Sequence, residues 1–387
     1  MLNTIGLVLI YAVLFFMMFY GAKISNRHEW NEEVFSLKQM KVLQGASAVF
    51  IMFHHMAQKT CAPWNPPAKI VHGLDCFVDI GYWFVSIFLF CSGFGLYKSF
   101  KNKENYLKGF VKARILPIII AFYVSEFLFF IVRLLMHEKM DTKTIIYYLI
   151  GFKLANYYGW FVVALPLFYL FFYLAFKLCK KDGMAIFMTG VGITAYVLLG
   201  MIIDHNDYLM KGEWWYNTAY LFLIGIIFAR FEKSVVDFFK KIYPVSLILA
   251  AILVVVLFMF SLWAQGFFSY YCEYWGISMF EKVGRRSVCM FSQMLTATSF
   301  VLLVFLITMK IRTGNKLLTF FGGITLETYL VHGIFVELFG FNFLDVTKSL
   351  YYIKSVPLYV FVVLVCSVPS ILIFKKLLGV ITGKLKR

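Results

Sequence analysis

Seven titratable side chains stand inside long apolar stretches of this sequence, where burial makes each of them costly. They are His54, His55, Glu126, Arg133, Glu327, His332 and Glu337. A neutral histidine is available as a general base near neutral pH, because its unperturbed pKa is about 6.5. A carboxylate such as Glu126 or Glu327 would orient and polarise that ring if the fold places it alongside. These residue types predict proton transfer within the apolar part of the protein.

Helical geometry places two of the histidines deep within their apolar stretches. His55 lies 14 residues beyond Lys41, which is roughly 21 Å along a helix, and His332 lies 15 residues beyond Leu317, roughly 22 Å. Gln44 and His55 are 11 residues apart, so their side chains share one helix face to within about 20°. A polar stripe that leads to a deep histidine is what a transfer path needs.

The same polar side chains also have a purely structural interpretation. They would then hydrogen-bond to neighbouring helices and hold the bundle together. We favour that interpretation for His54, Arg133 and Glu337, and the transfer path for His55.

A cluster of basic residues precedes another apolar stretch. It consists of Lys98, Lys101, Lys103, Lys108, Lys112 and Arg114. Such clusters usually fix topology and contact lipid headgroups. Arg114, three residues before Pro117, is also placed to pair with a phosphate or pyrophosphate. A nucleotide-type donor such as a coenzyme A thioester would be held there.

The elements that position these residues follow from composition. Of 387 residues, 61% are hydrophobic and only 15% are charged, and the mean hydropathy is +0.80. This surplus of apolar residues excludes a soluble enzyme, a nucleic-acid-binding module and a disordered chain. Long apolar runs argue against a β-barrel. The seven cysteines form no C-x-x-C motif, so no metal site is expected.

We therefore predict an all-α polytopic membrane protein with about eleven transmembrane helices. The spans are expected near residues 3–22, 42–58, 79–97, 115–134, 157–177, 184–203, 214–230, 243–264, 287–309, 317–340 and 355–374. Each has about the 20 apolar residues that cross a bilayer. Ser92-Gly93 is interpreted as a close-packing point. The first span is expected to be a retained anchor.

Basic residues test this division. The gaps 23–41, 98–114, 177–182, 230–241, 310–316 and 375–387 hold 25 Lys and Arg residues. The gaps 59–77, 136–143, 204–213, 265–286 and 341–354 hold 10. By the positive-inside rule the richer set faces the cytoplasm, so we expect the amino terminus outside and the carboxyl terminus inside. The net charge of +17 is thus explained by topology, without a nucleic-acid partner.

Two outer segments are irregular. In the gap 59–77, Cys61 and Cys76 either close the loop as a disulfide or remain free thiols. The aromatic-rich gap 265–286 is expected to be a long interfacial loop anchored by cations, and a role in gripping an acceptor is the less favoured alternative. Three regions follow: 1–35, an anchor with its cytoplasmic connection; 36–378, the main transmembrane domain; and 379–387, a basic cytoplasmic tail.

Several short motifs resemble one family. They are Leu43 to Met56 with His55 near its end, the aromatic run Phe88 to Leu96, the basic segment Phe110 to Pro117, and the later stretches Gly159-Trp160-Phe161, Glu213 to Asn217 and Leu326 to Gly333. In order and spacing they resemble the integral-membrane acyltransferase family 3, which moves acyl groups onto extracytoplasmic glycans and related acceptors. The resemblance covers roughly residues 36–375 and leaves the first span as an addition.

The resemblance implies a ten-helix core that takes acyl-CoA, most often acetyl-CoA, from the cytoplasm and acylates an outer hydroxyl; no permanently bound cofactor is implied. The family's essential histidine falls on His55. The basic residue that usually stands before it falls on Gln44, and Lys41 lies one turn earlier. Arg114 and Lys112 would hold donor phosphates.

In the same framework Glu126, Glu327 and His332 would tune or relay protons. The partners implied are acyl-CoA, an extracytoplasmic carbohydrate or other cell-envelope acceptor, and the lipid bilayer. The family's usual setting, together with the absence of a glycosylation sequon, favours a bacterial plasma (inner) membrane.

Two alternatives remain at this point. Intramembrane His, Glu and Arg residues also suit a transporter or flippase for a lipid-linked or small anionic solute, although no repeat pair is visible in the sequence. Gln44 at the usual basic position also suits a family member that binds donor or glycan without catalysis.

Overall fold

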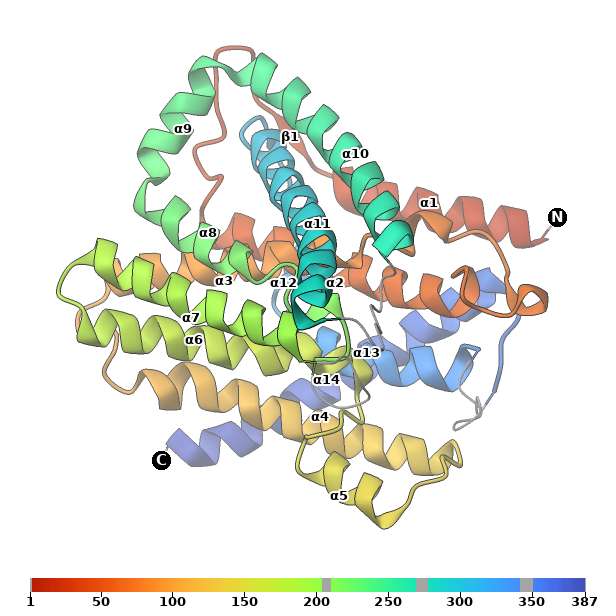
Figure 1. The fold of residues 1–387 in the computed structure, drawn as a ribbon. Coiled ribbons are helices and arrows are strands. Elements are labelled where there is room, and N and C mark those ends of the chain that lie inside the picture. Colours follow the sequence, from red (N-terminus) through yellow and green to blue (C-terminus); the bar gives the residue numbers. More distant parts are fainter. Residues whose placement is uncertain (1, 204–209, 269–277, 342–350, 387) are drawn as a thin grey trace.

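The chain is almost entirely helical, as expected. A computed structural model describes residues 2–203, 210–268, 278–341 and 351–386 (Figure 1). Its helices are α1 Leu2–Phe19, α2 Leu37–Thr60, α3 Gly81–Asn102, α4 Leu116–Leu135, α5 Thr142–Leu149, α6 Trp160–Leu178, α7 Asp182–Ile202, α8 Tyr220–Arg230, α9 Glu232–Lys241, α10 Tyr243–Phe268, α11 Met279–Thr308, α12 Lys316–Gly322, α13 Thr325–Phe339 and α14 Val356–Lys386. Two short strands, β1 Lys23–Ile24 and β2 Ile311–Arg312, pair antiparallel.

Every segment predicted to span the membrane contains a helix, and the protein is a multi-pass membrane protein. Seven helices in the described chain are long and apolar enough to cross a bilayer, or eight if the bent pair α12/α13 counts as one span. α1 is apolar but shorter, and α2 and α8 do not meet the same test. The predicted total of eleven spans therefore stays a prediction. The span predicted at 317–340 is not continuous, because α12 and α13 meet at 88°.

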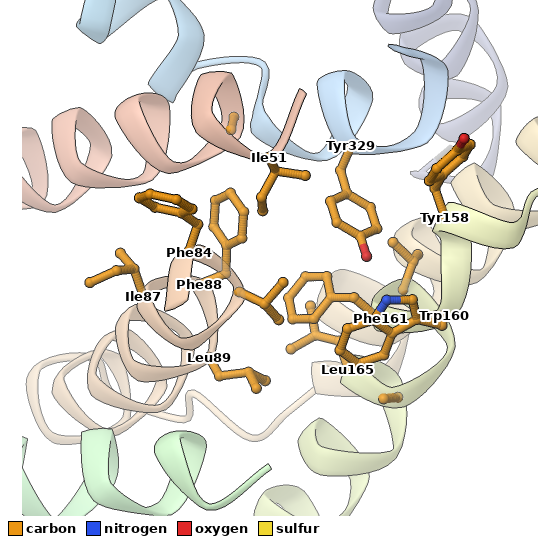
Figure 2. Packing of buried hydrophobic residues seen from close by; sticks show 14 of the residues in the cluster. Ile51, Phe84, Ile87, Phe88, Leu89, Tyr158, Trp160, Phe161, Leu165 and Tyr329 are labelled. Carbon is orange, nitrogen blue, oxygen red and sulfur yellow. The ribbon is translucent and has the colours of Figure 1, made fainter. Parts of the chain in front are cut away.

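α2 lies at the centre of the bundle. It packs on α3, α12 and α13, and most of its residues are buried. Its sequence is less apolar than that of a lipid-facing span because it faces protein rather than lipid. Figure 2 shows Ile51 of α2 packed with Phe84 and Phe88 of α3, Phe161 of α6 and Tyr329 of α13. This cluster fills the bundle interior next to the histidines.

Glycines allow the central helices to approach closely. A Cβ on Gly45 would lie 2.2 Å from the backbone oxygen of Leu318. A Cβ on Gly93 would lie 2.0 Å from the backbone oxygen of Phe222 in α8. The close-packing interpretation of Ser92-Gly93 is confirmed, since small residues at membrane helix contacts let backbones meet.

Contacts between connecting segments follow the division made from the basic residues. At one end of the bundle Lys98 pairs with Glu232 at 2.7 Å, and Arg312 pairs with Glu33 at 2.6 Å. At the other end Lys69 lies over the Phe341 ring. No ion pair among the described residues joins the two sets of gaps, and the termini lie at opposite sides of the bundle (Figure 1). The structure thus separates two faces, and the assignment of one to the cytoplasm remains a prediction.

The predicted long loop at 265–286 is wrong in extent. α10 continues to Phe268 and α11 begins at Met279, capped by the Ser278 hydroxyl; residues 269–277 lie outside the described part. Arg286 is not an interfacial anchor, because it is buried and donates hydrogen bonds to the carbonyls of Met201 and Ile203, both at 2.7 Å. α14 continues through the predicted basic tail as far as Lys386.

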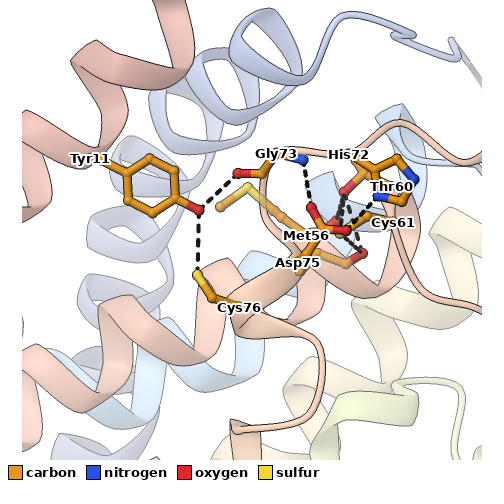
Figure 3. A network of polar contacts seen from close by, with 9 residues as sticks. Tyr11, Met56, Thr60, Cys61, His72, Gly73, Asp75 and Cys76 are labelled. Atoms are coloured by element: carbon orange, nitrogen blue, oxygen red, sulfur yellow. Dashed lines mark hydrogen bonds and ion pairs between the residues drawn. The ribbon is translucent and has the colours of Figure 1, made fainter. Parts of the chain in front are cut away.

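The loop at 59–77 contains free thiols, not a disulfide. Cys61 is buried and Cys76 is exposed. Figure 3 shows how the loop is held against α1: the Tyr11 hydroxyl donates to the Gly73 carbonyl at 2.8 Å and lies 3.4 Å from the Cys76 sulfur. Partial burial raises the pKa of Asp75, but hydrogen bonds from His72 and the Gly73 N–H outweigh this and lower it below its usual value.

Candidate active site

The two deep histidines meet inside the bundle. His55 of α2 and His332 of α13, separated by 277 residues in sequence, place Nδ1 and Nε2 2.7 Å apart. The rings are nearly parallel, at 9°, and both residues are buried. The sequence places both at similar depth, and the structure brings them into direct contact.

The hydrogen bonds around this pair define which nitrogens carry protons. His332 Nδ1 lies 2.6 Å from the Thr328 carbonyl oxygen, which only accepts, so that nitrogen carries the proton. In the neutral ring Nε2 is then an acceptor, and it receives the N–H of His55 Nδ1. The remaining nitrogen, His55 Nε2, is left unprotonated. This is the state that a general base requires.

A cavity of about 560 Å³ opens beside His55. His55 is part of its wall and His332 is not. Trp64 and Asn65, from the connection after α2, line it together with residues of α3, α10 and α13. The connection belongs to the gaps that we expect outside the cell, so the cavity faces the predicted extracytoplasmic side. Within the described chain no side chain is seen hydrogen-bonded to His55 Nε2.

An ion pair forms another part of the cavity wall. Lys59, one helical turn beyond His55, lies 2.9 Å from Glu337. The Tyr158 hydroxyl donates to the same carboxylate oxygen at 2.6 Å, and the Tyr158 ring lies 4.3 Å from the His55 ring between centroids. Glu337 thus fixes two groups that flank the histidine, as its structural interpretation predicts. Lys59 was missed because the sequence places it in a loop.

Tyr329 also lines the cavity, one helical turn before His332. It is 3% exposed, and its hydroxyl has no hydrogen-bond partner among the described residues. The hydroxyl points away from α13 toward Trp160 and Phe161 (Figure 2). Sequence reasoning included Tyr329 only as part of a motif. A buried hydroxyl without a partner is a signal that only the tertiary structure carries.

The carboxylates expected to orient the histidine do something else. Both oxygens of Glu126 accept backbone hydrogen bonds, from Ala155 at 2.7 Å and from Asn156 at 3.2 Å. Glu126 therefore holds the segment that brings Tyr158 to the cavity, and neither histidine is among its hydrogen-bond partners. Glu327 lies in the first turn of α13, half-buried and outside the cavity lining. The Thr328 carbonyl and His332 take the orienting position instead.

His54, the neighbour of His55, joins α2 to the start of α3. Its Nδ1 lies 2.8 Å from the Phe77 carbonyl oxygen. A Cβ on Gly81 would lie 2.3 Å from the His54 ring, so α3 begins directly against it. The structural interpretation of His54 fits this geometry.

The residues expected to hold the donor lie toward the other end of the bundle. Lys112 and Arg114 are exposed on the π-helical turn Val111–Ile115, and the Arg114 guanidinium lies 5.6 Å from the Tyr106 ring. Lys41 is exposed and Gln44 is half-buried, at the start of α2. None of these four residues lines the cavity that contains His55. Their role in donor binding stays a prediction.

Comparison with known proteins agrees with the motifs. A family model described as an acyltransferase domain matches residues 37–375. No curated protein and no solved structure matches the chain. The matched segment runs from the start of α2 into α14, so it contains both histidines and the whole cavity wall. The chain therefore belongs to acyltransferase family 3 and is a membrane acyltransferase.

Proposed function

We propose that the protein transfers an acyl group, in the first instance acetyl, from acyl-CoA at the cytoplasmic face to a hydroxyl of an extracytoplasmic glycan or similar acceptor. The observation that carries this proposal is the unprotonated His55 Nε2 at the wall of a cavity that opens toward the predicted outer face. Gln44 lies 11 residues from His55, roughly 16 Å along α2, so the thioester must reach into the bundle from the other side.

In the proposed reaction the acceptor hydroxyl gives its proton to His55 Nε2 while its oxygen attacks the thioester carbonyl carbon. The C–S bond then breaks, and the imidazolium returns the proton to the coenzyme A thiolate, which leaves as the thiol. His332 stabilises the transient imidazolium by accepting its Nδ1–H. His55 is the only residue whose protonation state changes in this proposed step.

Tyr329 has a place in the same step. Its hydroxyl carries a proton with no acceptor in the described chain and borders the cavity that contains His55. It would donate to the thioester carbonyl oxygen as negative charge develops there. Such a donor needs no rearrangement at the moment of reaction.

The test compares membranes carrying the parent protein or His55→Gln, given radiolabelled acetyl-CoA and an envelope glycan extract of the host. We expect labelled glycan with the parent and a loss of about 10²- to 10⁴-fold with the variant, the usual contribution of a general base. Equal transfer by both would overturn the role of His55. Absence of thioester consumption across several acyl-CoAs would favour the transporter.

A further inference from the structure

Asp79 is a carboxylate of the cavity wall that none of the described residues neutralises. It lies in the connection between the short turn Asp75–Phe77 and α3, and it lines the same cavity as His55. Its side chain is exposed to that space. The described residues give it no hydrogen-bond or ion-pair partner.

The other charges at the wall are already paired. Glu337 Oε1 is bound by Lys59 at 2.9 Å and by the Tyr158 hydroxyl at 2.6 Å, so the negative charge of this carboxylate is already paired within the wall. Lys211 does not line the cavity, and its ammonium lies 4.2 Å from the ring centroid of the lining residue Tyr157. Asp79 thus contributes an acceptor of hydrogen bonds and one negative charge to the open space.

Asp79 is held at a fixed position relative to the base. The His54 ring binds the carbonyl of Phe77, two residues before Asp79, and abuts Gly81, two residues after it. His54 is itself adjacent to His55 in α2. Asp79 and His55 are therefore both positioned by the His54 side chain. A ligand that contacts both meets preorganised groups, and preorganisation favours binding.

The surrounding wall suits a ring with apolar faces and polar edges. Trp64, Trp160 and Trp214 contribute large aromatic surfaces, and Gln265 contributes an amide. The Gln265 Nε2 donates a hydrogen bond to the Ser261 carbonyl oxygen at 3.0 Å. Its amide oxygen adds a second acceptor of hydrogen bonds to the wall.

We infer that Asp79 binds the acceptor by accepting hydrogen bonds from neighbouring hydroxyls or an ammonium group, so the site takes neutral or amino-bearing polyols and rejects acidic ones. A phosphate, sulfate or uronate beside the reacting hydroxyl would lie against an unpaired carboxylate, and like charges in contact weaken binding strongly. This inference rests on the proposed function and adds the charge class of the acceptor.

The test uses the full-length protein in membranes with labelled acetyl-CoA. The envelope glycans are separated by ion exchange into neutral, basic and acidic fractions, and each fraction is offered to the parent protein, to Asp79→Asn and to Asp75→Asn. Asp75 is the matched control, because it lies in the same loop but binds His72 and Gly73 and does not line the cavity. Asparagine at either position preserves an acceptor of hydrogen bonds.

We expect the parent and the control to acylate the neutral or basic fraction at least about 10-fold better than the acidic one. Asp79→Asn should raise the KM for the acceptor about 10- to 100-fold, the range expected for a lost charged hydrogen bond. It should also reduce the ratio of transfer into the neutral or basic fraction to transfer into the acidic fraction. The KM for acetyl-CoA should not change. Transfer mainly into the acidic fraction, or equal effects of the two substitutions, would overturn the inference about Asp79 without contradicting the proposed acyltransferase activity. Absence of transfer into every fraction would overturn the proposed function itself.

Discussion

At the scale of residues, the histidine pair replaces the carboxylate–histidine arrangement that the sequence suggested. A neutral His332 is a weaker partner for an imidazolium than a carboxylate, but its own Nδ1–H is fixed by the Thr328 carbonyl at 2.6 Å. Because His332 Nδ1 already carries a proton, His55 Nδ1 must be the donor and His332 Nε2 the acceptor in the 2.7 Å hydrogen bond between the two rings. The arrangement orients the base without burying a further charge, which membrane interiors tolerate poorly.

His332 should therefore act through His55 and not on the substrate. We predict that His332→Ala lowers kcat by about 100-fold or more, because the His55 ring loses the acceptor that fixes its tautomer. His332→Gln, whose amide oxygen can accept the same N–H, should recover part of that loss. Steady-state kinetics of both variants check this. Equal damage by the two, with unchanged pH profiles, would indicate a packing role only.

A substitution at Tyr329 can separate an effect on catalysis from an effect on stability. Tyr329→Phe removes a hydroxyl that makes no hydrogen bond in the described structure, so the melting temperature should not fall. The kcat should fall about 10²-fold if the hydroxyl stabilises the developing oxyanion. Tyr359→Phe is the control, because the Tyr359 hydroxyl donates to the Val336 carbonyl at 3.1 Å and does not line the cavity. It should lower stability and leave kcat unchanged. The reverse pattern would exclude Tyr329 from the chemistry.

At the scale of elements, the position of α2 depends on contacts where helix backbones nearly touch. α3 packs closely on both α2 and α8, and α12 packs on α2. Because α2 carries His55 and α3 begins beside Asp79, small shifts between these helices change the shape of the cavity. Glycine at the crossings makes this packing possible.

Substitution at one crossing should show this directly. Gly93→Ala places a Cβ 2.0 Å from the Phe222 backbone oxygen, so α3 and α8 must separate. We predict a loss of about 1–3 kcal/mol in the free energy of unfolding, measured as a lower thermal midpoint in detergent. Gly95→Ala, two residues on in the same helix, meets no atom within 4 Å and should be neutral or slightly stabilising. Equal midpoints for the two variants would contradict the close contact.

At the scale of the whole molecule, the two sets of connections lie at opposite ends of the helices, and the histidine cavity opens toward the less basic end. In the proposed reaction, the donor and the acceptor approach the protein from these two opposite ends. The loop at 59–77, which contributes Trp64 and Asn65 to the cavity wall, is held against α1 by the hydrogen bond from Tyr11 to Gly73.

The direction of insertion can be measured with the native thiols of that loop. In a chain whose only cysteine is Cys76, a membrane-impermeant maleimide should label intact cells, because Cys76 is exposed and predicted to face outward. A chain whose only cysteine is Cys61, buried in the same loop, should stay unlabelled until the protein is denatured. Labelling of Cys76 only after the cells are opened would reverse the predicted orientation.

The sequence by itself determined the helices and the two faces. Apolar runs must form helices in lipid because every backbone group has to be satisfied within the segment, and basic residues mark one side. The motifs around His55 also identified the family. Two predictions from the sequence were wrong. The apolar run at 317–340 continues across the bend between α12 and α13, so hydropathy did not reveal the break. The apolar part of α11 is shorter than the helix, which already begins at Met279.

Only the tertiary structure decided what the site residues touch. Hydropathy does not encode which helices meet, because helix contacts in membranes depend on packing and on individual hydrogen bonds. His55 contacts His332, which is 277 residues away in the sequence, and Glu126 accepts a hydrogen bond from the backbone N–H of Ala155. Asp79, which no pattern singles out, became a cavity residue because His54 holds its segment beside the base.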